Sequence, residues 1–476
     1  MHNPQRREFL KHAACSAVGY GLVSTVFDLY KMNAVAAQAG DYKALVCLFL
    51  FGGNDSNNVL VPRAGADYAA YAGGRGNLAL PAAQLLPITP ATSDGRQYGL
   101  HPSMTGVQQL FQGGKAAFLC NVGSLASPIT RAQWLAGTAP VPRQLFSHSD
   151  QQLQWQTSIA DQAARTGWGG RMADIVRSLN LNATVSMSIT VAGNNTFQVG
   201  SVVTPYQVSP NGGTGLDGYQ PEDPTDAETR AINRILQREH TNIFENAYRD
   251  AVKRVIDNAA AIQQAVDQAP ALTTQFPDTG LGQELQMIAR LISARNIFSH
   301  RRQIFFCSVG GYDTHGPQLG SQAGLLQELS DAVTAFYNAT AEMNVHNQVT
   351  TFTASDFSRT FVSNGEGSDH AWGGHHFIVG GAVRGGDLYG RFPVPVVNGP
   401  DDSGDGLWIP TTAVDEYAAT LATWFGVSQD GPPDDLPEHR AVRSSEPRIH
   451  GVEGWWGGGG GQMGVRSCLS TFVAKG

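Results

Sequence analysis

Strand-like apolar runs and segments with helical spacing alternate along most of this chain. Short apolar runs rich in β-branched and aromatic residues predict buried strands at 44–51, 115–122, 303–309, 349–354 and 375–383. Apolar residues at three- and four-residue spacing predict helices at 103–112, 281–296, 320–343 and 413–425. Strand–helix–strand order recurs through 303–357. This order predicts an α/β fold with a doubly wound, mainly parallel sheet and helices on both faces.

Two other segments have patterns of their own. Residues 183–208 alternate between polar and apolar positions, which predicts a hairpin-rich sheet. Residues 226–268 are helical in pattern and predict either two helices or one long lid-like helix. We therefore expect a single α/β domain over residues 40–433, with a helical insertion near 226–268.

The N-terminal segment, residues 1–39, is typical of a twin-arginine signal peptide. The motif Arg6-Arg7-Glu8-Phe9-Leu10-Lys11 precedes an apolar stretch that is too short for a confident membrane span, and Ala37-Gln38-Ala39 supplies a cleavage site. A frayed N-terminal helix is the alternative. The signal predicts export through the Tat translocase to the periplasm or the extracellular space, with no stable membrane span.

The C-terminal segment, residues 434–476, loses the periodicity seen in the rest of the chain and includes five consecutive glycines. One choice of codons from about Glu438, read one base later, encodes a plausible helix and loop. The hypothesis is a frameshifted, disordered tail.

Composition excludes several functions. The net charge of −8 and the pI of about 5.9 argue against a nucleic-acid surface. Cys47, Cys120 and Cys307 lie in strand-like runs, which favours buried thiols over disulfides. There is no Gly-x-Ser-x-Gly elbow, no P-loop and no Gly-x-Gly-x-x-Gly after a strand, so serine-hydrolase and nucleotide-binding interpretations lack support.

Acids and histidines gather where the predicted strands end. The candidate metal ligands are Asp55, after the run 44–51; Asp313 and His315, after 303–309; Asp356, after 349–354; and His370 and His375, in the next cluster. Carboxyl ends of neighbouring strands share one edge of a sheet. Carboxylate and imidazole groups there predict a divalent metal: Zn, Mn, Mg or Ca. Each acid taken alone could equally be a turn or cap residue, and His376 could be a structural histidine.

Two residues are candidates for binding or attacking an anionic group. Arg359 could bind phosphate or sulfate with two parallel hydrogen bonds, or it could be an arginine paired with an acid. Thr130 is predicted at a helix start, where backbone N–H groups favour negative charge, although an ordinary helix cap is the alternative. His148 and Asp150 fit either an outer layer of hydrogen bonds around a metal or a solvated loop.

The chain resembles the exported bacterial family called domain of unknown function 1501. The resemblance covers about residues 1–430 and is carried by the twin-arginine signal and seven motifs. These are Phe51-Gly52-Gly53-Asn54-Asp55-Ser56-Asn57-Asn58, His101-Pro102-Ser103-Met104, Phe146-Ser147-His148-Ser149-Asp150-Gln151-Gln152, Thr166-Gly167-Trp168-Gly169-Gly170-Arg171, Gly311-Tyr312-Asp313-Thr314-His315-Gly316, Ser355-Asp356-Phe357-Ser358-Arg359-Thr360 and Asp369-His370-Ala371-Trp372-Gly373. The family is grouped with the alkaline phosphatase and sulfatase superfamily, which implies hydrolysis of phosphate or sulfate esters in an anionic small molecule or polymer.

The resemblance also implies roles for individual residues. Thr130 would be the nucleophile, Arg359 would assist, and the metal ligands would be Asp55, Asp313, His315, Asp356, and His370 or His375. The sequence departs from the superfamily pattern at Phe357, where phosphatases usually have histidine, and in the two-residue spacing of Asp313 and His315, which is usually four. These departures leave a one-metal site as an alternative to two zinc ions. The leading hypothesis is an exported metal-dependent hydrolase, and the rival is a catalytically inactive envelope protein that uses the same fold for binding or assembly.

Overall fold

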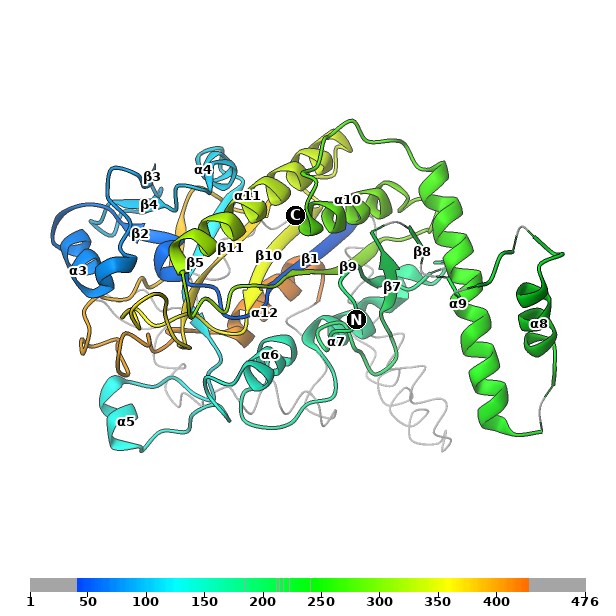
Figure 1. Cartoon of the computed structure of the whole chain (residues 1–476), viewed down its shortest axis with the longest axis horizontal. Helices are drawn as coiled ribbons and strands as arrows, with labels where there is room; N and C mark the ends of the chain where they lie inside the picture. Colours follow the sequence, from blue (N-terminus) through cyan, green and yellow to red (C-terminus); the bar gives the residue numbers. More distant parts are fainter. Residues whose placement is uncertain are drawn as a thin grey trace, which may run out of the picture.

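A sheet of ten strands forms the centre of the computed structural model, which describes residues 41–427 except 184, 211, 214, 217, 222 and 240. The strands are β1 (Lys43–Leu50), β5 (Ala116–Gly123), β6 (Ser188–Thr190), β7 (Tyr206–Ser209), β8 (Gly212–Gly213), β9 (Arg302–Val309), β10 (Val349–Ser355), β11 (Gly374–Gly380), β12 (Leu388–Gly390) and β13 (Thr412–Ala413). Their order is β12-β5-β11-β10-β1-β9-β6-β7-β8, with β13 beside β5 (Figure 1). The predicted signal peptide and frameshifted tail lie outside the described residues.

Most neighbouring strands are parallel, as the sequence predicts. β10, β1, β9, β6 and β7 run in the same direction, and β11 is antiparallel to both β10 and β5. All eight residues of β1 are buried. Its side chains alternate between two apolar clusters, with Val46 and Leu48 in one and Cys47 and Phe49 in the other. A strand covered on both faces has an unbroken apolar sequence, which is why this segment could be recognised.

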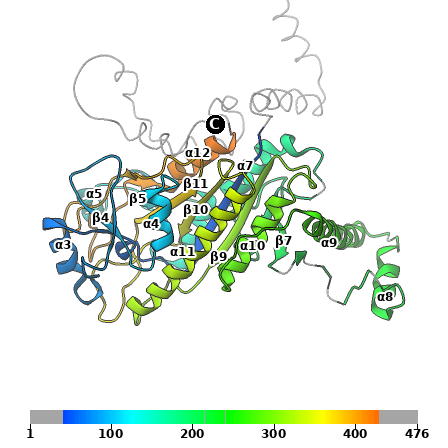
Figure 2. The same cartoon turned by 90° about the horizontal axis from the view of Figure 1, so that it is seen from above.

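Helices cover both faces of the sheet. The first cluster includes residues of α4 (Thr105–Gln112), α10 (Gly280–Ser293) and α11 (Gln318–Glu342). The second cluster includes residues of α7 (Trp168–Val176) and α12 (Val414–Phe425). Figure 2 shows these two groups on opposite sides of the strands. The predicted doubly wound α/β fold is therefore confirmed.

Smaller elements complete the described part of the chain. β2 (Leu60–Pro62), β4 (Tyr98–Leu100) and β3 (Leu86–Ile88) form an antiparallel sheet beside α3 (Gly65–Arg75). The short helices α5 (Arg131–Ala136) and α6 (His148–Thr157) follow β5. The predicted buried thiols are confirmed at Cys47, Cys120 and Cys307. Within residues 41–427, none of the helices combines the length and apolar character that crossing a membrane requires.

The predicted hairpins at 183–208 are wrong. β6 and β7 pair in parallel, so the chain between them crosses over instead of turning back. The crossing segment packs on α7, where a Cβ on Gly170 would lie 2.1 Å from the carbonyl carbon of Val199. Glycine therefore allows an approach that a local alternation of polar and apolar residues cannot reveal.

Residues 226–268 form two helices, α8 (Ala227–Leu236) and α9 (Ile243–Gln268). They extend from one end of the molecule as an arm (Figure 1). The C-terminal part of α9 packs on the body through Ala259, Ile262, Ala265 and Val266.

Candidate metal centre

Three parallel strands bring the acids of the site to one edge of the sheet. β1 lies between β10 and β9, so the loops that follow these strands meet at their carboxyl ends. Asp356 follows β10 directly, and Asp313 lies four residues after β9. Gly52, with a φ of +112°, contacts both acidic loops. Its N–H donates to Asp356 Oδ2 over 3.2 Å. A Cβ on it would lie 2.4 Å from the backbone nitrogen of Asp313. The close approach of the loops therefore requires glycine.

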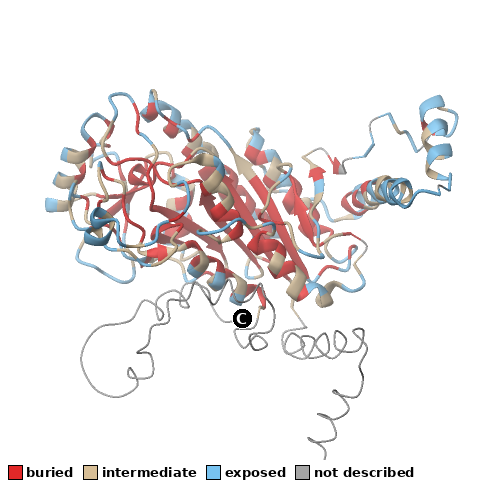
Figure 3. Cartoon of the chain, turned by 90° about the horizontal axis from the view of Figure 1, so that it is seen from below, coloured by how far each residue is buried: buried red, intermediate tan, exposed pale blue. Residues whose placement is uncertain are grey.

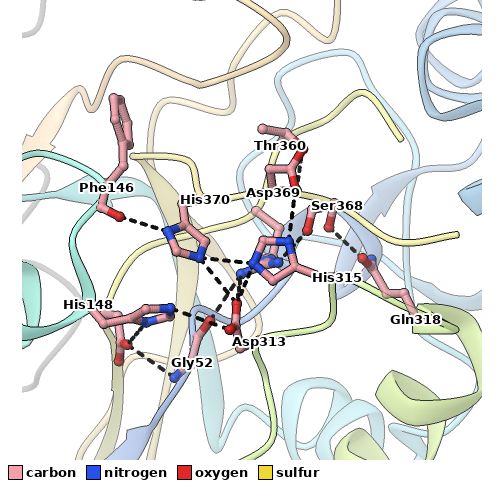
Figure 4. Close-up of polar contacts among 12 residues, drawn as sticks. Gly52, Phe146, His148, Asp313, His315, Gln318, Thr360, Ser368, Asp369 and His370 are labelled. Carbon is pink, nitrogen blue, oxygen red and sulfur yellow. Dashed lines mark hydrogen bonds and ion pairs between the residues drawn. The ribbon is translucent and has the colours of Figure 1, made fainter. Parts of the chain in front are cut away.

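Three histidine rings surround the Asp313 carboxylate (Figure 4). His315 Nε2 and His370 Nε2 lie 3.0 and 3.3 Å from Asp313 Oδ1, and His148 Nε2 lies 3.5 Å from Oδ2. The Nε2 atoms of His315 and His370 are 3.1 Å apart. One ligand atom each from His148, Asp313 and His370 lies within 4.8 Å of the others. His315 contacts two members of this trio.

The other nitrogen of each ring is held by an oxygen. The Nδ1 partners are Asp356 Oδ2 for His148 at 2.6 Å, the Phe146 carbonyl for His370 at 2.7 Å, and Asp369 Oδ1 for His315 at 2.9 Å. A carbonyl and ionised carboxylates only accept, so Nδ1 carries the hydrogen and Nε2 of a neutral ring presents a lone pair. Lone pairs and carboxylate oxygens at these distances repel unless a proton or a cation lies among them. This donor set fits a divalent metal.

Burial and charge set the protonation states of the centre. Burial raises the pKa of Asp313, but the hydrogen bond from Arg359 and its positive charge, with the nearby histidines, outweigh burial and hold that pKa below its usual value. Burial lowers the pKa of His370, partly opposed by the Phe146 carbonyl. Asp313 is therefore ionised and His370 neutral at pH 7, the states in which both bind metal.

Asp356 lies behind His148 and orients its ring. Burial raises the pKa of this carboxyl, and hydrogen bonds from His148, Gln152 and Gly52 partly offset the effect. Asp356 Oδ2 takes all these contacts, and Oδ1 is a buried oxygen without a hydrogen-bond partner. Phe357, which replaces the expected histidine, packs beside the rings of His148 and His370, at 4.9 and 4.6 Å between ring centres. It supports the histidines that face Asp313.

Arg359 has a different place from the one predicted. Its buried guanidinium donates to Asp313 Oδ1 at 2.5 Å, to the Gly52 carbonyl at 3.3 Å and to the Ser368 carbonyl. The sequence predicts this residue as a phosphate or sulfate ligand, and the structure places it in a pair with an acid, the alternative that the sequence left open. It fixes Asp313 among the histidines.

The structure does not bring Asp55 to this centre. Its buried carboxylate forms an ion pair with Arg75 and accepts a hydrogen bond from Gln318. Arg75 also donates to the carbonyls of Thr360 and Phe361 at 3.0 and 3.1 Å. Asp55, which the sequence predicts as a metal ligand, therefore lies outside the cluster, where its oxygens serve a buried ion pair.

Thr130 and His375 also lie outside the cluster. Thr130 is exposed and caps α5, where its hydroxyl accepts from the Gln133 N–H at 3.3 Å, so the helix-cap alternative holds. His375 points into the core from β11, stacks on Phe392 and accepts from the Asn121 N–H at 3.2 Å. Neither residue is in place to act as the predicted nucleophile or metal ligand.

The buried histidines of β11 predict a loss of stability in acid. Burial lowers the pKa of His375 and of His376 to about 3. The unfolded chain binds these protons below about pH 6.5, so stability present at pH 7 is lost as the pH falls. At pH 5 we expect the free energy of unfolding to be about 2 kcal/mol lower for each ring than at pH 7. Denaturant unfolding of wild type and His375→Gln at pH 7 and pH 5 measures it.

The variant provides its own control, because Glu284 acts in the opposite direction. Burial raises the pKa of Glu284 to about 7, so the folded state gains a proton there as the pH falls. That contribution is the same in both proteins. Between pH 7 and pH 5, the free energy of unfolding of His375→Gln should fall by about 2 kcal/mol less than that of wild type. Equal losses would contradict a neutral, buried His375.

His148 is the site residue that the sequence underestimated. The sequence placed it either in an outer layer or in a solvated loop, and the structure places it against Asp313. The available signal was its position at the start of the polar helical segment that also carries Trp155. Conversely, the sequence predicts Asp356 as a ligand, and its hydrogen bonds with His148 and Gln152 place it behind His148.

Comparisons with known proteins agree with the family resemblance. A sequence model of the family described as "Protein of unknown function (DUF1501)" matches residues 42–398. No curated protein matches the chain.

Two solved structures illustrate its structural neighbours. The sulfatase PsFucS1 from Pseudoalteromonas sp. is 9% identical, with a TM-score of 0.34 over 85% of this chain and 72% of that one. The lipoteichoic acid synthase LtaP from Listeria monocytogenes is 8% identical, with a TM-score of 0.32 over 83% of this chain and 74% of that one. At these identities the chemistry must be argued from the residues of this chain.

Proposed function

We propose that this chain, which belongs to the DUF1501 family, is a metal-dependent hydrolase of phosphate or sulfate esters. One observation carries the proposal: three imidazoles, each held at Nδ1 by an oxygen, turn Nε2 toward a single ionised carboxylate. Such preorganised donors cost stability unless a cation offsets their repulsion, so they are typical of functional sites.

The donors indicate which ion the centre would hold. His148, Asp313 and His370 would bind it, and His315 lies against two of these residues. A mixed nitrogen and oxygen set favours Zn or Mn over Ca, which prefers oxygen ligands alone. A bound divalent ion supplies a positive charge that polarises an ester oxygen and lowers the pKa of a bound water.

Water is the nucleophile that this arrangement supports. The Thr130 hydroxyl is engaged as a helix cap, so the superfamily's threonine nucleophile has no counterpart at that position. The His315 side chain is 44% exposed beside Asp313, and its Nε2 would accept the proton of the attacking water. Asp369, bonded to His315 Nδ1, would stabilise the imidazolium that forms. The ester class comes from the resemblance to phosphatases and sulfatases.

A second candidate is a metal-binding protein without catalytic activity. Phe357 favours it, because this apolar ring is packed beside His148 and His370 where a two-metal phosphatase has histidine. Such a protein would bind the ion at the same residues and leave esters intact.

Chelation tests the proposal directly. The purified full-length protein is assayed with p-nitrophenyl phosphate and p-nitrophenyl sulfate before and after treatment with a chelator. We expect hydrolysis of one ester to fall at least about a hundredfold, since a metal contributes several kcal/mol to such a reaction. Zn or Mn should restore it. Chelator saturated with metal beforehand is the control.

Two outcomes would contradict the hydrolase. Hydrolysis that survives complete removal of metal would show that the centre is not responsible. A protein that binds one equivalent of metal tightly and hydrolyses neither ester would favour the binding protein.

A further inference from the structure

The arm made by α8 and α9 leaves a large part of its apolar surface uncovered. Figure 3 shows the arm mostly exposed, beside a largely buried sheet. Phe244 is 80% exposed, Tyr248 is 74% exposed and Val255 is 40% exposed. Two exposed aromatic rings on one helix are costly in water, since each would bury a large apolar area in contact with a partner.

These residues lie on one face of α9 in a coiled-coil spacing. Phe244, Tyr248, Ala251 and Val255 are separated by four, three and four residues. This is the d-a-d-a order of a heptad, which places the four side chains along one seam. The same helix buries its later residues against the body, so the seam occupies the half of α9 that extends away from it.

We propose that this seam binds the same seam of a second copy of the chain, in antiparallel orientation. The spacing reads identically in both directions about the midpoint between Arg249 and Asp250. In antiparallel pairing, heptad position a of one copy faces heptad position d of the other. Phe244 then lies opposite Val255, and Tyr248 lies opposite Ala251. Large rings meet smaller side chains, as interdigitated packing requires.

Charge supports a second copy over a charged partner. Residues 243–258 carry three acids, Glu245, Asp250 and Asp257, and three bases, Arg249, Lys253 and Arg254. A net charge of zero gives no attraction for an anionic membrane or an acidic protein. Beside the antiparallel seam, Glu245 of one copy lies opposite Val252 of the other, and Ala247 lies opposite Arg254. No like charges therefore face each other.

The attachment of α9 favours the antiparallel orientation. The C-terminal end of the helix packs on the body. Two parallel copies would therefore bring two bodies, each part of a chain with a net charge of −8, to the same end of the seam. Antiparallel copies place the bodies at opposite ends. This inference does not depend on the proposed hydrolase function.

Sedimentation of the full chain over a range of concentrations tests the dimer. Wild type is expected to shift from monomer to dimer, and Phe244→Glu with Tyr248→Glu should raise the dissociation constant roughly thirtyfold or more. Lys253→Glu, on the outer side of the same helix, is the matched control and should dimerise like wild type. Circular dichroism checks that each variant is folded.

A cysteine pair tests the orientation. Tyr248→Cys combined with Ala251→Cys should form a disulfide-linked dimer with the oxidant diamide, whereas Tyr248→Cys alone should not exceed wild type. Cross-linking of the single variant would indicate parallel pairing. A wild-type monomer at every concentration, a dimer insensitive to Phe244→Glu, or a monomer that binds anionic lipid vesicles through the seam would each overturn the proposal.

Discussion

Replacing Asp55 with alanine is expected to lower the free energy of unfolding by about 3–5 kcal/mol. The side chains of Asp55 and Arg75 are 1% and 0% exposed, so their ion pair has no access to water. Arg75 remains tied to the carbonyls of Thr360 and Phe361 in the variant. Its charge would stay buried without a counterion, which costs more than the loss of the pair itself. Denaturant unfolding at pH 7 measures the change.

The double variant Asp55→Ala with Arg75→Met is the matched control. It removes both charges, so much of the lost stability should return. It also keeps the prediction testable if the single variant fails to fold. Metal content provides the second measurement: both variants, when folded, should bind metal like wild type. Unchanged stability with loss of metal would show that Asp55 is a ligand after all.

Asp55 illustrates how far the sequence could specify the site. Apolar runs covered on both faces identify the central strands, and parallel neighbours bring their carboxyl ends to one edge, so the location of the site follows from local patterns. Asp55, Asp313 and Asp356 look equivalent at this level. Their partners distinguish them: Arg75 lies on α3, twenty residues from Asp55. Long-range contacts of this kind leave no periodic signal in the sequence.

The histidines show the same limit. His370 and His375 are five residues apart in one polar cluster, yet His370 faces Asp313 and His375 faces the core. The direction of each ring depends on the pairing of β11 with β5 and on the bridge between Arg359 and His370. His148 comes from α6, which lies more than 150 residues before Asp313 and His370 in the chain. The sequence could identify these residue types but could not choose among them.

Replacing Asp313 with asparagine is expected to weaken the binding of a divalent metal at least about a hundredfold. This estimate extends the ten- to hundredfold typical of residues that only orient a ligand. The Asp313 carboxylate lies at the point where His148, His315 and His370 converge. Asparagine keeps the shape and can still accept from Arg359, but it removes the negative charge. Isothermal titration with Zn and with Mn measures the affinity.

Two matched variants separate this effect from a general loss of charge. Asp356→Asn alters the oxygen that holds Nδ1 of the proposed ligand His148, so we expect a loss of about tenfold in metal affinity. Asp278→Asn, an exposed acid before α10, should have no effect. A metal at Asp313 requires a graded series, in which the loss of affinity is largest for Asp313→Asn and absent for Asp278→Asn. If Asp313→Asn kept the affinity of wild type, the three imidazoles would be held by a shared proton, and the proposed hydrolase would lose its metal.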